Sequence, residues 1–63
     1  MLITINTGGE AFKPDPRREV SRILSELSDR VSTEGLTDPC RLVIRDVNGG
    51  RVGLLEYRKE NHA

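Results

Sequence analysis

The pattern of apolar and polar side chains predicts one long helix in the first half of the chain. Its apolar positions recur at three- and four-residue spacings along one helical face: Val20, Ile23, Leu24, Leu27 and Val31. The opposite face carries charged and small polar residues, among them Glu19 and Arg22. Asp15 is suited to the N-cap, with Pro16 in the first helical position, and Gly35 to the C-terminal turn. We therefore expect a helix over residues 16–34, with Leu24 as a core residue.

Three shorter segments have the composition of β-strands. Residues 2–6, 40–47 and 51–58 are rich in aliphatic side chains, and segments with Gly, Pro or Asn separate them. The order strand, helix, strand, strand predicts a single α+β domain of the βαββ type. In it, one amphipathic helix packs on a three-stranded antiparallel sheet with the third strand in the middle. A sheet with the first two strands parallel and adjacent is the alternative. Residues 1–58 are expected to form the ordered core and residues 59–63 a flexible tail.

A two-residue loop at Asn48-Gly49 is the preferred connection between the last two strands. Asn-Gly between apolar segments is a strong hairpin signal, because both turn residues must accept positive φ. The resulting register pairs opposite charges across the hairpin: Asp46 with Arg51 and Arg41 with Glu56. A loop one residue further along would oppose like charges instead.

This register divides the hairpin residues between two faces. The face expected to receive the helix contains Cys40, Leu42, Ile44, Leu55 and Tyr57. The other face mixes aliphatic and charged side chains: Leu2, Arg41, Val43, Arg45, Val52, Leu54 and Glu56. A half-buried sheet normally alternates more cleanly. The second face is either an ordinary scatter of exposed apolar residues or an interface, and we take it as the candidate interface.

The small size of the chain calls for burial beyond its own core. The chain has 63 residues, of which 35% are hydrophobic and 3% aromatic, and a domain of this length buries only about 60% of its unfolded surface. The single Cys40 excludes an internal disulfide, and Cys40 with His62 is too few ligands for a closed zinc site. We therefore expect a homodimer, with Leu54 near the centre of its interface.

The charge balance restricts the classes of partner. Ten Lys/Arg and ten Asp/Glu residues give a formal net charge of zero, which is unlike a dedicated nucleic-acid-binding domain. Arg17, Arg18 and Arg22 cluster early in the helix, however, and are the candidate nucleic-acid-contacting residues. No apolar segment approaches the ~18 residues of a membrane span, and the first residues lack the features of a signal peptide. We expect a soluble cytoplasmic protein that does not bind membranes.

The sequence shows no recognisable set of catalytic residues. Cys40 is expected in the core, His62 in the tail, and the carboxylates are scattered. Residues 46–57 begin like a calcium loop, but Tyr57 stands where a bidentate Glu is needed. The glycine-rich residues 49–53 join two strands, whereas phosphate-binding loops join a strand to a helix. We expect neither enzymatic activity nor a cofactor or metal.

Segments 10–12, 19–27 and 45–53 resemble a widespread set of very short proteins encoded by bacteriophages, prophages and plasmids. Proteins of this size and origin include anti-CRISPR proteins, which occupy a surface of a bacterial defence complex. The resemblance implies a non-enzymatic accessory protein that binds and inhibits a host protein or ribonucleoprotein complex in the bacterial cytoplasm. It implies no particular site residues. A small nucleic-acid-binding regulator and a structural subunit of a phage particle are the alternatives.

Overall fold

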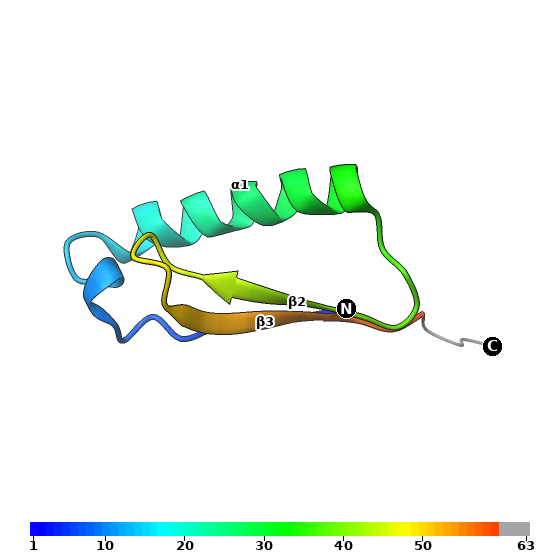
Figure 1. The fold of residues 1–63 in the computed structure, drawn as a ribbon. Coiled ribbons are helices and arrows are strands. Elements are labelled where there is room, and N and C mark those ends of the chain that lie inside the picture. Colours follow the sequence, from blue (N-terminus) through cyan, green and yellow to red (C-terminus); the bar gives the residue numbers. More distant parts are fainter. Residues whose placement is uncertain (60–63) are drawn as a thin grey trace.

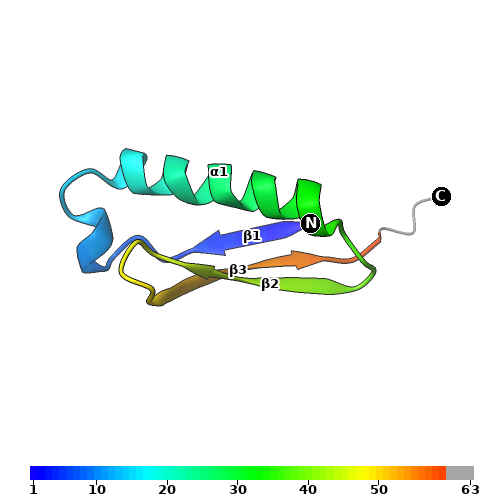
Figure 2. The same cartoon turned by 45° about the horizontal axis from the view of Figure 1, so that its top comes forward.

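The computed structural model describes residues 1–59 and has the expected order of strand, helix, strand, strand: β1 (Leu2–Ile5), α1 (Pro16–Glu34), β2 (Cys40–Arg45) and β3 (Arg51–Tyr57). A short 3-10 helix that was not predicted, η1 (Glu10–Phe12), lies between β1 and α1. The strands form one antiparallel sheet in the order β1-β3-β2. Helix α1 covers one face of this sheet (Figure 1), and β1 and β2 form its two edges (Figure 2). The predicted βαββ fold is confirmed, and the parallel alternative is wrong. Of the predicted tail, residues 60–63 lie outside the described residues.

The ends of α1 lie where the capping residues predict them. The side chain of Asp15 accepts hydrogen bonds from the backbone N–H groups of Arg17 at 3.1 Å and Arg18 at 3.4 Å. At the other end Gly35 has a φ of +77°, and its N–H donates to the carbonyl of Val31 at 2.9 Å. Glycine adopts positive φ without the steric cost that a Cβ imposes, so the helix ends there.

The core lies between α1 and the sheet and is small. Within residues 1–59 its buried hydrophobic side chains are Phe12, Ile23, Leu27, Ile44 and Leu55. Leu24 was expected among them, but 46% of it is exposed. One helical residue corresponds to about 100° of rotation, so Leu24 lies about 100° from Ile23 and reaches only the flank of the buried face. The prediction of Leu24 as a core residue is therefore wrong.

The β2–β3 hairpin has a three-residue loop rather than the predicted two-residue loop. Asp46 closes it, because its N–H donates to the carbonyl of Gly50 at 2.8 Å and its carbonyl accepts from Gly49 at 2.9 Å. Gly49 has a φ of +85°, whereas no other residue type among residues 1–59 has positive φ, so Asn48 does not adopt the predicted turn conformation. The Asp46 carboxylate accepts from the N–H groups of Asn48 and Gly50, both at 2.9 Å. Asp46 thus stabilises the turn and does not pair with Arg51.

The extra loop residue is compensated by a bulge in β3. Beyond the turn the predicted register holds, with Arg41 opposite Glu56, but between Ile44 and Arg45 it shifts, and Arg45 faces Arg51. Val52 is consequently an additional residue in β3. At a β-bulge two residues oppose one, which interrupts the alternation of side chains.

The bulge changes the face on which Val52 lies. Val52 packs against the core cluster, so its prediction as part of the outer interface is wrong. The next residue, Gly53, faces Ile5 of β1. A Cβ at position 53 would overlap the carbonyl oxygen of Thr4. Only glycine therefore allows β1 to approach β3 at this point.

Candidate binding surface

The sheet face opposite α1 carries the candidate interface. Two cross-strand rows define it: Leu2, Glu56 and Arg41 in one row, and Thr4, Leu54 and Val43 in the other. With Arg45 and Arg51, which oppose each other near the hairpin loop, these residues form what we call the outer face. The structure thus brings together the predicted interface residues except Val52. The outer face also includes Thr4 and Arg51, which were not among the predicted interface residues.

The outer face has an aliphatic centre and a charged rim. Leu54 and Val43 are half-buried, and Leu2 is 58% exposed. On the rim, Arg41 and Glu56 form an ion pair with 3.9 Å between Nε and Oε2. The Arg41 side chain is 76% exposed and the Glu56 side chain 43% exposed, so this long, solvent-accessible pair contributes little to stability. Because two further arginines, Arg45 and Arg51, flank the hairpin end, the rim has an excess of positive charge.

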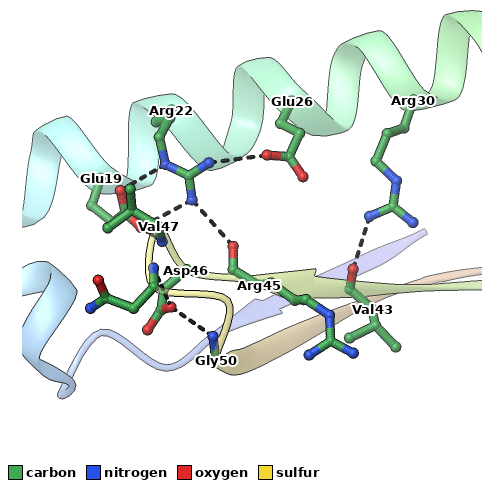
Figure 3. Close-up of polar contacts among 10 residues, drawn as sticks. Glu19, Arg22, Glu26, Arg30, Val43, Arg45, Asp46, Val47 and Gly50 are labelled. Atoms are coloured by element: carbon green, nitrogen blue, oxygen red, sulfur yellow. Dashed lines mark hydrogen bonds and ion pairs between the residues drawn. The ribbon is translucent and has the colours of Figure 1, made fainter.

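Apart from the outer face, a polar cluster that the sequence did not predict joins α1 to the hairpin (Figure 3). Arg22 donates from Nε to Oε1 of Glu19 at 2.8 Å and from Nη2 to Oε2 at 3.0 Å. The N–H of Val47 donates to the same Oε2 at 2.8 Å. Arg22 also donates to Glu26 at 3.0 Å and to the carbonyl of Arg45 at 3.2 Å. The side chain of Glu19 is only 7% exposed, although the helical pattern placed it on the polar face.

These contacts shift the pKa values of both Glu19 and Arg22. Hydrogen bonds from Arg22 lower the pKa of Glu19; burial acts in the opposite direction, and the Val47 amide lowers that pKa further. The same pair raises the pKa of Arg22. The spacings between Glu19, Arg22 and Glu26 suit local pairing on a helix. The contact with Val47, however, depends on where the hairpin folds.

The three arginines proposed for nucleic-acid contact do not form one free cluster. Arg22 is engaged by Glu19, Glu26 and the Arg45 carbonyl. Arg17 and Arg18 are exposed near the start of α1, and the Nε of Arg17 lies 3.8 Å from the Asp15 carboxylate. A shallow hollow at this end of the molecule is lined by side chains of both charges: Ala11, Pro14, Asp15, Arg18, Glu19, Arg22 and Val47. The carboxylates in this lining are unfavourable to a phosphate group.

The described part of the chain shows no metal-binding cluster, and its one cysteine is a free thiol. Within residues 1–59 no group of three or more His, Cys, Asp or Glu residues is arranged to hold a metal ion. Cys40 is a partly buried free thiol at the start of β2, and His62 lies outside the described residues. No helix in that range is long and apolar enough to cross a membrane.

No protein-family model, curated protein or solved structure matches the chain. The resemblance to short phage-encoded proteins therefore stays a prediction.

Proposed function

We propose that this protein is a non-enzymatic accessory protein of a phage or other mobile element that inhibits a host defence complex by binding it through the outer face. The observation that supports the proposal is the arrangement of this face. It carries Leu2, Val43 and Leu54 across all three strands within a charged rim. An apolar centre with a polar rim is typical of protein interfaces.

The charges of the rim specify the chemistry of the partner. Three arginines, Arg41, Arg45 and Arg51, accompany one carboxylate, Glu56. A complementary partner surface has an apolar patch surrounded mainly by acidic groups. Occupying such a surface requires no catalytic group on the inhibitor. Anti-CRISPR activity is the most concrete form of this function, with the protein component of the defence complex as the target.

The test compares two glutamate substitutions in a bacterium with an active defence system. Leu54→Glu places an unpaired carboxylate at the centre of the outer face, which costs several kcal/mol in a dry interface. Val47→Glu introduces the same charge in the hairpin loop, where Val47 is 64% exposed. We expect phage plating to be restored by the native protein and by Val47→Glu, but not by Leu54→Glu. Affinity for the purified complex is expected to fall about 100-fold or more in Leu54→Glu only.

Other outcomes would overturn the proposal. Equal inhibition by the native protein and Leu54→Glu would remove the outer face from the mechanism. Binding only to nucleic acid, with an affinity that falls steeply with salt, would favour the regulator that uses Arg17 and Arg18. Recovery only within purified virions would favour a structural subunit. The regulator has less support, because Arg22 is already held in ion pairs.

A further inference from the structure

The two edges of the sheet differ in how their backbone groups are used. On the β2 edge, Nη1 of Arg30 donates to the carbonyl of Val43 at 2.8 Å, and Nη2 of Arg22 donates to the carbonyl of Arg45 at 3.2 Å (Figure 3). An added strand would need these same carbonyls as acceptors. Two arginines of α1 therefore protect the β2 edge against pairing with another chain.

The β1 edge has no comparable protection within residues 1–59. The N–H of Asn6 donates to the carbonyl of Val52 at 2.8 Å, so in the antiparallel ladder Leu2 and Thr4 also direct their backbone groups toward β3. The backbone groups of Ile3 and Ile5 consequently point away from the sheet. No charged side chain occurs in residues 1–6. An uncharged edge rich in isoleucine is well suited to strand pairing.

Apolar side chains accompany this open edge. Ile3 is 39% exposed and Leu24 is 46% exposed. Leu24 follows Arg22 by two residues, about 200° around the helix, and so lies on the flank of α1 away from the β2 edge. The β2 side of the molecule therefore carries the arginine network, whereas the β1 side carries exposed aliphatic groups and free backbone groups.

We propose that the β1 edge pairs with the β1 edge of a second copy, antiparallel about a two-fold axis, and that the two sheets become one six-stranded sheet. With Thr4 on the axis, Ile3 of each copy pairs with Ile5 of the other. The outward N–H and C=O groups of these four residues then form hydrogen bonds between the two copies. The side chains of residues 2–6 are all uncharged, so no like-charged side chains face each other across this pairing. Because the β2 edge is protected, pairing ends at two copies and does not continue into a filament.

This dimer leaves the outer face accessible. A two-fold axis perpendicular to the sheet places both helices on one side, and the two outer faces then join into one surface on the other side. The inference therefore does not depend on the proposed function. It also differs from a dimer that pairs the outer faces through Leu54, and the two arrangements are separable by experiment.

The first experiment measures mass and amide exchange as a function of protein concentration. Sedimentation equilibrium is expected to show a rise in mass from 7.1 kDa toward twice that value. Over the same range the amides of Ile3 and Ile5 should become protected from hydrogen exchange, whereas the amide of Thr4 is protected throughout. A mass of 7.1 kDa at the highest attainable concentration, or a dimer whose Ile3 and Ile5 amides exchange freely, would overturn the proposal.

The second experiment uses matched lysine substitutions. Ile3→Lys puts a charge on the edge strand, and Leu24→Lys puts one on the neighbouring helix flank, where the side chain is already 46% exposed. Val47→Lys makes the same change in the hairpin loop. We expect Ile3→Lys and Leu24→Lys to weaken dimerisation about tenfold or more, and Val47→Lys to leave it unchanged. Loss of the dimer in Leu54→Glu but not in either edge variant would assign it to the outer face and contradict our proposal.

Discussion

The carboxylate of Glu19 connects α1 to a hairpin that follows much later in the chain. It accepts from Arg22 on its own helix and from the backbone N–H of Val47, 28 residues away. A buried carboxylate is stable in the charged form only when such donors surround it. Within residues 1–59 no buried side-chain nitrogen or oxygen lacks a hydrogen-bond partner. The charged form of Glu19 is therefore a structural component of the fold.

This arrangement predicts that acid destabilises the native protein more than it destabilises the Glu19→Gln variant. Since the folded state lowers the pKa of Glu19 below its ordinary value of 4.5, the unfolded chain binds this proton more readily than the folded protein does. The stabilisation is present above pH 4.5 and is lost as the pH falls through the lower, folded-state pKa. Urea denaturation at a series of pH values between neutral and acid measures the free energy of unfolding of both proteins. The free energy of unfolding should decrease more on acidification in the native protein than in Glu19→Gln, and parallel curves would contradict the assignment.

At the scale of the element, α1 presents three kinds of surface around its circumference. Ile23 and Leu27 are buried against the sheet, Arg22 and Arg30 lie toward the β2 edge, and Leu24 is on the far flank. The apolar pattern of the sequence is wider than the strip that one three-stranded sheet covers. Leu24 is the residue at which this difference becomes visible.

Two alanine substitutions on α1 should therefore have unequal effects. Ile23→Ala removes a fully enclosed side chain and should lower the free energy of unfolding by about 2–5 kcal/mol, which such a small domain does not readily tolerate. Leu24→Ala should cost about 1 kcal/mol or less, because that side chain is already half in water and alanine favours helices. Urea denaturation at low protein concentration compares them, with Ile23→Val as a milder variant if Ile23→Ala does not fold. Equal destabilisation by both alanines would place Leu24 in the core.

At the scale of the whole molecule, edge protection sets the extent of assembly. Arg30→Ala frees the carbonyl of Val43 and exposes part of the β2 edge. With a free β1 edge and a partly free β2 edge, copies can add in sequence. We expect light scattering to reveal species larger than a dimer for Arg30→Ala. Arg41→Ala is the matched control, since it removes an arginine from β2 whose side chain pairs with Glu56 and covers no backbone carbonyl. Identical masses for both variants would contradict a protective role of Arg30.

The features that the sequence determined are those set by neighbouring residues. Asp15 and Gly35 define both ends of α1 because each acts within one helical turn. The residue alternation in the strands predicted the helix-facing positions Ile44 and Leu55, and the opposite charges of Arg41 and Glu56 indicated the register of most of the hairpin. These interactions are short in sequence or follow directly from the alternation of a strand, so a linear pattern contains them.

Tertiary structure decided the features that depend on how the elements meet. The turn stabilised by Asp46 adds one residue to the loop, and the compensating bulge moves Val52 from the outer face to the core. Glu19 is buried because the hairpin folds over it, and Leu24 is exposed because the sheet is narrower than the apolar face of the helix. The difference between the two sheet edges has the same origin, because the arginines of α1 reach only the carbonyls of β2. Apart from the Asp46 turn and its bulge, which rest on hydrogen bonds between near neighbours in the chain, each of these outcomes depends on distances between segments that are far apart in the chain, and a linear pattern does not encode such distances.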